Sequence, residues 1–340
     1  FARFMARHFK GRVAIYEIWN EDFGMPPGDE KDKFRRYVDF LKEVAPVIRD
    51  EDPKAMISFT GLKGRFMVGE EIRDTPGSPQ DFLDILQETD VAKHIDVIGW
   101  HCQGHLWYPA SNRYLDYPNN VRRMKQVAEA NGFKGIYIAQ ENWWGAPYPP
   151  NGPASRKVEA DRAIDTLTEI RKAKDMARLF MIQRGLDAIP IWCNTWMDQI
   201  QNDGGLMRNS FSADPISPQQ PQAAYYVLRT LCTVMDQAEP DDQLMVQFSN
   251  NDQVFENWNF NRPDGELYVA LWLPGDSKDN CPAVRTDVLI RRIKASEITA
   301  IDLFNGFEQK VDFTLRRDIT IVPNLLIRDY PTILRVKPGK

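Results

Sequence analysis

The chain has 340 residues, of which 43% are hydrophobic and 27% are charged, and its formal net charge at pH 7 is −5. This composition is typical of a globular protein, and the length suits one large domain plus a smaller one. Because phosphate binding needs a basic face, an acidic chain with only scattered basic pairs excludes nucleic acid and acidic membrane surfaces as expected partners. No apolar run reaches the roughly 18 residues that a membrane span needs.

The first two thirds of the chain alternate short apolar runs with longer amphipathic runs, a rhythm that predicts strands and helices in turn. The predicted strands cover residues 13–19, 55–60, 96–100, 135–140 and 187–193. The predicted helices cover residues 31–49, 80–93, 119–131, 158–183 and 219–235. Five such units in a row favour a parallel sheet with helices packed outside it.

No glycine-rich phosphate loop follows any predicted strand, which disfavours a nucleotide-binding doubly wound sheet. The α/β architecture that remains is the (β/α)8 TIM-type barrel, in which active sites collect where strands end. Five units are visible where a barrel needs eight, so we interpret residues 1–238 as an incomplete catalytic barrel that lacks about three N-terminal units. Such a fragment would have an unpaired strand edge, and we expect it to be unstable or inactive in isolation.

The pattern changes near Pro240. From residue 243 onward, short β-rich runs are separated by turn signals, among them Asn305-Gly306 and Pro263-Asp264-Gly265. Both are residue combinations that favour tight turns between strands. We therefore predict an all-β sandwich domain over residues 239–340.

The four cysteines are far apart and form no Cys-x-x-Cys pair. They therefore indicate neither a disulfide framework nor a zinc site, and we expect no metal or organic cofactor. The chain opens at Phe1 in a run typical of mid-helix, so we expect the native N-terminus and any targeting segment upstream. A secreted or periplasmic location is favoured, and the oligomeric state is not predicted.

Two carboxylates are set apart by their positions. Glu21 follows the first predicted strand and Glu141 follows the fourth, 120 residues later. On a barrel they would face the same mouth, where two carboxyls suit glycoside cleavage: one protonates the leaving oxygen and the other attacks the anomeric carbon or activates water. A separation of about 5–5.5 Å predicts retention, and about 6.5–9.5 Å predicts inversion. The alternative is that each glutamate caps a helix or lies on the rim.

A family resemblance sharpens this choice. The run Tyr-Glu-Ile-Trp-Asn-Glu at residues 16–21 resembles the Trp-Asn-Glu signature that ends the fourth barrel strand of clan A glycoside hydrolases. The resemblance implies that Glu21 is the general acid/base and that Asn20 binds the sugar's 2-hydroxyl. Ile-Ala-Gln-Glu at residues 138–141 resembles the end of the clan's seventh strand, which implies that Glu141 is the nucleophile.

Three further segments resemble the same clan. Residues 98–101 look like the sixth strand, which ends in a residue near the nucleophile, here His101. Residues 191–193 look like the eighth strand, which supplies an aromatic platform, here Trp192. The visible strands would then be strands four to eight. Residues 326–331 are similar to the accessory β domain of family 39 and its neighbours. Gln140 departs from the usual Thr or Ser, and Asp22 from the usual Pro, which concerns the family more than the clan.

Other candidate sugar contacts are loop aromatics and histidines, because flat apolar rings can pack against sugars. These are Trp143 and Trp196, for which packing of loops onto the body is the alternative, and His105. His101 and His105 have the spacing of a helical metal pair, but Gly104 lies between them, so sugar contacts are favoured. Glu17 is mid-strand, and we predict a buried, hydrogen-bonded barrel residue there rather than the catalytic acid.

The sequence therefore predicts a retaining hydrolase of O-glycosidic bonds that acts on a plant-type or related oligosaccharide or polysaccharide, with carbohydrate as its partner. One alternative is a non-catalytic carbohydrate-binding protein on the same scaffold. Another is a metal-dependent barrel hydrolase. The sugar, the linkage and the choice between exo and endo action are not predicted, because the fold does not determine them.

Overall fold

The computed structural model describes residues 1–20, 30–59, 79–103, 113–143, 168–192, 206–209 and 218–339. The chain divides into two compact units. The first comprises Phe1–Trp143 and Ala188–Cys193, and it contains a parallel sheet. The second comprises Trp144–Asp187 and Asn194–Lys340, and it contains the antiparallel sheets.

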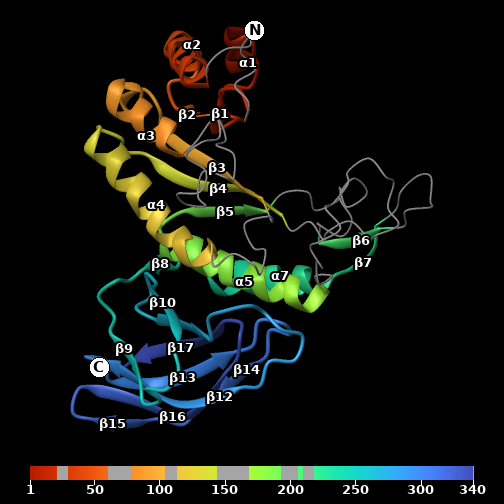
Figure 1. Cartoon of the computed structure of the whole chain (residues 1–340), viewed down its shortest axis with the longest axis vertical. Coiled ribbons are helices and arrows are strands. Elements are labelled where there is room, and N and C mark those ends of the chain that lie inside the picture. The colour runs from red at the N-terminus through yellow and green to blue at the C-terminus, as the bar shows by residue number, and fades with distance from the viewer. Residues whose placement is uncertain are drawn as a thin grey trace. The chain divides into compact units, whose positions relative to one another are not determined.

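The first unit is built on a five-stranded sheet whose spatial order, β1-β2-β3-β4-β5, is also its order in the chain (Figure 1). Its strands are β1 (Ile15–Glu17), β2 (Met56–Ser58), β3 (Val97–Gln103), β4 (Ile136–Trp143) and β5 (Ile189–Trp192). Every neighbouring pair is parallel. The predicted α/β class, with a parallel sheet of five strands, is confirmed.

The helices of this unit are α1 (Ala2–His8), α2 (Glu30–Glu51), α3 (Pro79–Glu88), the short η3 (Val91–Lys93) and α4 (Arg113–Ala130). Helix α1 precedes the first strand and packs on α2, and the helices from α2 onward follow the strands and cover one face of this sheet. Tyr37 of α2, Phe59 after β2 and Phe82 of α3 are fully buried and meet edge to face. Trp100 of β3 donates from Nε1 to the Tyr117 hydroxyl of α4 at 3.0 Å. Each such ring contributes roughly 2–3 kcal/mol by leaving water, so this face forms the core of the first unit.

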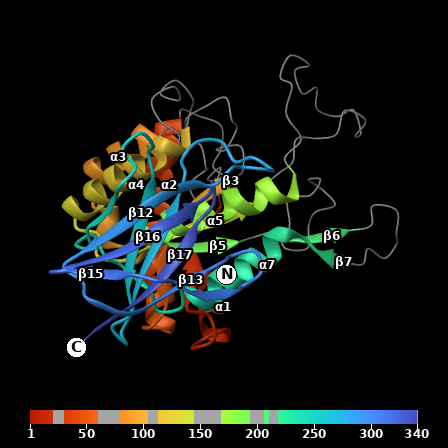
Figure 2. The same cartoon turned by 90° about the horizontal axis from the view of Figure 1, so that it is seen from below.

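Two large antiparallel sheets make up most of the second unit (Figure 2). Their orders are β14-β13-β17-β11-β10-β8 and β15-β16-β12-β9. The strands are β8 (Glu239–Pro240), β9 (Val246–Phe248), β10 (Glu256–Asn261), β11 (Leu267–Trp272), β12 (Val284–Arg291), β13 (Ala295–Ile301), β14 (Glu308–Lys310), β15 (Thr314–Arg316), β16 (Ile319–Ile327) and β17 (Thr332–Pro338).

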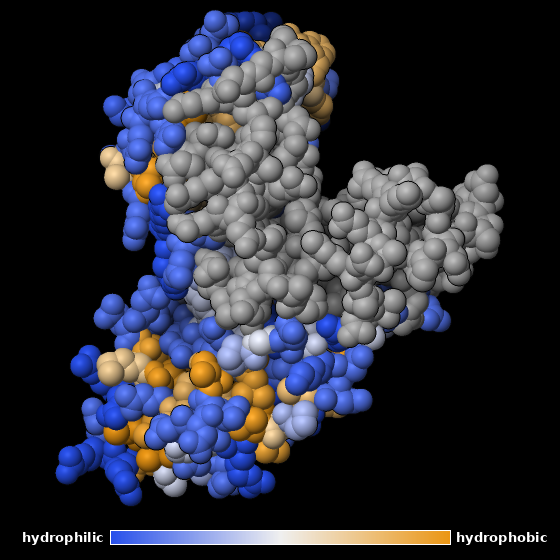
Figure 3. All heavy atoms as spheres, viewed as in Figure 1, coloured by the Kyte–Doolittle hydropathy of each residue, from blue (hydrophilic) through white to orange (hydrophobic). Residues whose placement is uncertain are grey.

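The two antiparallel sheets share one hydrophobic core. Leu271 of β11 and Leu334 of β17 from the larger sheet lie in the same buried cluster as Ile290 of β12 and Val322 of β16 from the smaller one. Strand β12 alternates buried and less buried residues, the pattern of a strand with one face in a core. Some apolar residues remain visible between the polar ones at the surface of this unit (Figure 3).

Two helices and a small ribbon complete the second unit: α5 (Glu169–Gly185), α7 (Ala223–Val234), β6 (Met207–Asn209) and β7 (Pro218–Pro221). Gly185 ends α5 against β10, where a Cβ atom would lie 1.9 Å from the Trp258 ring. Glycine is therefore needed for this close approach. Helices α5 and α7 group with the antiparallel sheets, and the domain limits of 1–238 and 239–340 stay a prediction.

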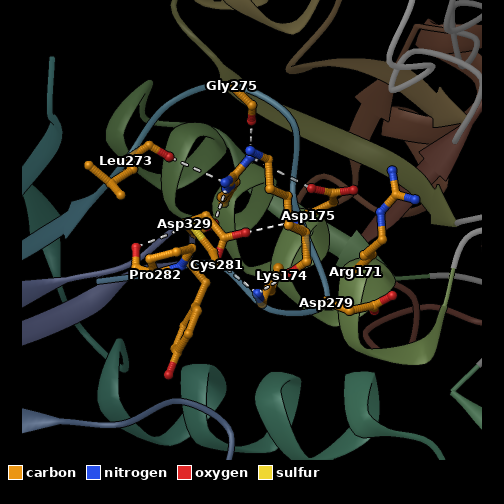
Figure 4. Close-up of polar contacts among 12 residues, drawn as sticks. Arg171, Lys174, Asp175, Leu273, Gly275, Asp279, Cys281, Pro282 and Asp329 are labelled. Atoms are coloured by element: carbon orange, nitrogen blue, oxygen red, sulfur yellow. Dashed lines mark hydrogen bonds and ion pairs between the residues drawn. The ribbon is translucent and has the colours of Figure 1, made fainter. Parts of the chain in front are cut away.

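A buried polar network holds α5 against loops of the antiparallel sheets (Figure 4). Lys174 donates to Asp329 Oδ1 at 2.8 Å and to the carbonyl oxygen of Lys278, whose own N–H donates to Asp329 Oδ2 at 2.8 Å. Arg178 donates to the carbonyl oxygens of Asp329 at 2.6 Å and Gly275 at 2.6 Å. Both cations are buried and hydrogen-bonded, which offsets the cost of removing them from water.

Asp175 lies in the same network. Burial raises the pKa of its carboxyl to about 6, although Arg178, with Nη1 3.8 Å from its Oδ1, acts in the opposite direction. The group therefore binds a proton more tightly in the folded protein than in the unfolded chain.

Candidate active site

Predicted site residues from several strands meet at one edge of the parallel sheet. Parallel strands end at the same edge, and this edge carries His101 of β3, Glu141 and Trp143 of β4, and Trp192 at the end of β5. Asn20 follows shortly after β1 and is exposed. Glu21, His105 and Trp196 lie outside the described residues, and for Glu141 and Trp143 the structure describes the backbone.

Strand β4 carries a β-bulge at Glu141. Against β3, the pairs His101↔Gln140 and Gln103↔Trp143 leave one extra residue on β4. Against β5, Ala139↔Pro190 and Asn142↔Trp192 leave one extra residue on β4 as well. Glu141 is the one residue of β4 that lies inside both irregular intervals. Bulges re-aim side chains and are over-represented beside active sites.

The side chain of Asn142 makes two hydrogen bonds at this bulge. Its Nδ2 donates to the carbonyl oxygen of Ala139 on its own strand at 2.9 Å and to that of Ile191 on β5 at 3.1 Å. Asn142 is buried, with only 2% of its surface exposed. A bulge interrupts the ladder of backbone hydrogen bonds, and buried carbonyl groups need partners. The amide of Asn142 supplies a donor at this interruption.

A second hydrogen bond crosses the sheet on the face away from the helices. Gln140 of β4 donates from Nε2 to Glu17 Oε2 of β1 at 2.8 Å. The two strands are separated by β2 and β3, and Gly99 of β3 lies under the amide. A Cβ atom at Gly99 would lie 2.7 to 2.9 Å from the Gln140 amide atoms, so glycine leaves the space that this bond occupies. Glu17 is thus hydrogen-bonded, as predicted, but it is half-buried and is the last residue of β1.

The length of this connection shows how the sheet curves. The register aligns Glu17 with Ser58, Val97 and Ile136, so Gln140 lies four residues further along β4. In a flat sheet, three strand spacings and that offset would separate the two Cα atoms by about 19 Å. Two such side chains cannot span this distance, so the sheet curls toward the face that carries them.

Three other described residues lie near strand ends of this sheet: His101, Trp192 and Trp19. His101 is the register partner of Gln140 and is buried, while Trp192 is the partner of Asn142 and is half-buried. Trp19 precedes Asn20 with φ at +74°, a left-handed conformation that costs a bulky residue on the order of 1–3 kcal/mol. Backbone strain of this kind gathers at functional sites, here beside the Asn20-Glu21 pair.

The described residues also bear on two other kinds of feature, a metal centre and a membrane span. Among these residues, no group of three or more His, Cys, Asp or Glu side chains is placed to hold a metal ion. Within the same residues, no helix has both the length and the apolar character to cross a membrane.

Sequence reasoning missed Asn142 and the role of Gly99. An isolated glycine inside a strand signals a bulge or a close approach, and Gly99 carries that signal. Asn142 has no comparable local signal, because its partners are carbonyl groups of a bulge that only the strand pairing reveals.

The chain matches no family model and no curated protein sequence. Solved structures do match it. A GH30 endoxylanase from Clostridium papyrosolvens has a TM-score of 0.57 at 12% identity, with 99% of this chain and 71% of that chain covered. A glucosidase from Croceicoccus marinus has a TM-score of 0.55 at 12% identity, with 100% and 73% covered. A GH51 arabinofuranosidase from Xanthomonas axonopodis pv. citri has a TM-score of 0.50 at 13% identity, with 99% and 72% covered.

These likenesses concern the fold. At such low identity they show that the chain shares an architecture with glycoside hydrolases of several families, and they do not single out family 39. Because unrelated activities can occupy one fold, the chemistry has to be argued from the strand ends themselves.

Proposed function

We propose that this chain is the larger part of a retaining glycoside hydrolase, with Glu21 as general acid/base and Glu141 as nucleophile. The observation that carries the proposal is the bulge at Glu141, at the end of a strand three places along from the one that leads to Asn20-Glu21. The fold shared with a GH30 endoxylanase and a glucosidase supports the same class of enzyme.

The bulge matters because of how side chains alternate. In a regular strand, Gln140 and the residue after it would point to opposite faces. Gln140 lies on the face that carries Glu17. A bulge at the next position allows two successive side chains to share a face, so Glu141 can be turned to the same mouth as Glu21.

The proposed chemistry is a double displacement. Glu21 gives its proton to the glycosidic oxygen while Glu141 attacks the anomeric carbon. The bond to the leaving group breaks, and a covalent glycosyl-enzyme forms. Glu21 then takes a proton from water, which attacks the same carbon and releases Glu141. Asn20 would bind the 2-hydroxyl.

The remaining predicted contacts would hold the sugar. His101 would lie near the nucleophile, and Trp192 would provide the platform beneath the ring. Trp143, His105 and Trp196 would line the rim. The carboxyl groups of Glu21 and Glu141 would lie about 5–5.5 Å apart.

We further propose that β1 to β5 are strands four to eight of a (β/α)8 barrel. Three features support this: parallel order, helices on one face, and a sheet that curls toward the opposite face. The antiparallel unit would then be an accessory β-sandwich like that of family 39 and its neighbours.

The test compares Glu141→Gln and Glu21→Gln in the full-length protein, with nitrophenyl glycosides of xylose, galactose, glucose and arabinose and with unactivated oligosaccharides. Glu141→Gln should abolish turnover of both kinds of substrate. Glu21→Gln should lose on the order of 10²–10⁴-fold with oligosaccharides but less with nitrophenyl glycosides, whose leaving group needs little protonation.

The control is Glu43→Gln, which removes an exposed carboxylate of α2 and should leave turnover unchanged. Calorimetric titration with the oligosaccharide should show binding in all three variants. Unchanged turnover in Glu141→Gln would contradict the role proposed for Glu141, whereas oligosaccharide binding without any turnover by the wild type would favour a carbohydrate-binding protein. Loss of wild-type turnover on chelation would favour a metal-dependent hydrolase instead.

A further inference from the structure

We propose that Gln140 and Asn142, the two chain neighbours of Glu141, are positioning residues that clamp the β4 bulge and so fix the direction of Glu141. The catalytic part of this inference rests on the proposed function. The structural part, that the two amides hold the bulge, stands on the described hydrogen bonds alone.

The clamp acts in two directions across the sheet. Asn142 ties the bulge to β5 through the carbonyl of Ile191, and to its own strand through the carbonyl of Ala139. Gln140 ties it to β1 through Glu17. Glu141 therefore lies between two residues whose side chains are both anchored, on opposite sides of β4.

The tie to β1 has a particular value for a two-carboxylate mechanism. Strand β1 leads into Asn20-Glu21, and β4 carries Glu141. The Glu17–Gln140 bond is a direct side-chain link between these two strands, across β2 and β3. Because the separation of the two carboxyl groups decides between retention and inversion, a link that fixes the spacing of their strands also fixes the reaction type.

Both ties use a primary amide as donor. The acceptors are two carbonyl oxygens for Asn142 and a carboxylate for Gln140. A carboxylate at either position would face oxygen atoms instead of donating to them. This chemistry suggests substitutions that keep the size of the side chain and reverse its role.

The first experiment is a swap of donor and acceptor. Gln140→Glu alone places two carboxylates against each other, and we expect kcat/KM for a nitrophenyl glycoside to fall roughly 100-fold, mainly through kcat. The double variant Glu17→Gln with Gln140→Glu restores one donor and one acceptor. It should recover most of the lost activity, because the two changes are coupled through one bond. A double variant no better than the single one overturns the tie to β1.

The second experiment tests the bulge without relying on turnover. Asn142→Ala and Asn142→Asp should speed amide hydrogen exchange in residues 139–143 and 189–192, because the carbonyl groups of Ala139 and Ile191 lose their donor. Both variants should also slow inactivation by a fluoro-glycoside that traps the nucleophile.

The matched control is Asn131→Ala. Asn131 also donates from Nδ2 to a carbonyl oxygen, that of Val127 at 2.8 Å, but it precedes the opposite end of β4. It should leave exchange in residues 139–143 and turnover at wild-type values.

The outcomes distinguish failure of the clamp from failure of the proposed function. If the wild type cleaves no glycoside while Asn142→Ala speeds exchange, the clamp is supported and the proposed function fails. If the wild type is active and Asn142→Ala matches it in exchange and in kcat/KM, the clamp is overturned and the proposed function stands. Faster exchange with unchanged kcat/KM overturns the positioning role.

Discussion

Buried polar groups have different structural roles in the two units. On helix α5, the buried cations Lys174 and Arg178 donate to Asp329 and to backbone carbonyl groups of two loops, in the network that Figure 4 draws. On the parallel sheet, Gln140 and Asn142 are neutral amides grouped around one residue of a strand end. The first arrangement joins a helix to a β structure, whereas the second shapes a few residues of backbone.

This difference has an energetic consequence. Removing one member of a buried ion pair leaves a charge without a partner, which is far more costly than the pair's net contribution to stability. Removing one neutral amide costs much less. We therefore expect changes in the α5 network to affect mainly the stability of the protein, and changes around Glu141 to affect mainly its activity.

The largest loss of stability is expected for Asp329→Ala. The substitution leaves the buried Lys174 ammonium without its carboxylate and removes the acceptor of the Lys278 N–H. We expect the free energy of unfolding to fall by about 3–5 kcal/mol, measured by urea denaturation. Activity per folded molecule should change little.

The control for Asp329→Ala is Glu297→Ala. Glu297 pairs with Lys310 at 2.6 Å in the same unit, but both side chains are exposed. Exposed pairs are weak because water and salt screen them. If the two variants shifted the urea midpoint equally, the structural role assigned to the buried network would be wrong.

The next largest effect is a pH dependence carried by Asp175. Its folded pKa of about 6 lies above the unfolded value of about 3.9, so the folded state holds the proton more tightly. Between these values the unfolded chain loses its proton first, and stability falls as pH rises. Asp175→Asn removes this dependence, and wild type should lose up to about 3 kcal/mol relative to the variant between pH 4 and pH 7.

Denaturation curves of both proteins at several pH values provide the measurement. Asp312→Asn, which removes an exposed carboxylate of the same unit, gives the baseline. Parallel curves for wild type and Asp175→Asn would mean that the buried carboxyl does not titrate in this range.

The hydrophobic pattern of the sequence predicted most of the strands of the parallel sheet. The features that it missed depend on contacts between residues far apart in the chain. Each predicted strand of the first unit overlaps a strand of the structure. The helix predicted from residue 119 begins at Arg113 instead. Its start was placed too late because Pro118, which lies inside the helix, is a residue that normally ends helices. Strand β4 was predicted to end at residue 140 but continues to Trp143, since the bulge lets pairing resume beyond it.

The position of Glu141 on the sheet could be predicted because it follows an apolar run directly. The clamp around it could not, because Gln140 and Glu17 are 123 residues apart and meet only when the sheet curls. The same holds for Lys174 and Asp329, which are 155 residues apart. Periodicity reports which face of an element is buried, and it carries no information about which polar groups meet there.

A third, smaller effect is expected for Gly99→Ala. The added methyl group would overlap the Gln140 amide and push it away from Glu17. Overpacking of this kind costs about 1–3 kcal/mol. Because the displaced residue precedes Glu141, kcat should fall even where the variant remains folded. Wild-type kcat in a variant whose stability has fallen would show that the tie has no part in catalysis.

The smallest effect is expected for Glu17→Gln, which tests how far the tie depends on charge. The new amide can still accept from Gln140 Nε2 through its own oxygen, so the bond survives but loses its ionic component. The stability should change by only about 1 kcal/mol. The informative readout is the pH profile of kcat/KM. If Glu17 only holds Gln140 in place, the profile keeps its shape, whereas a displaced acidic limb would show that the Glu17 carboxylate acts on the titration of the catalytic pair and would give it a larger role than that of an anchor.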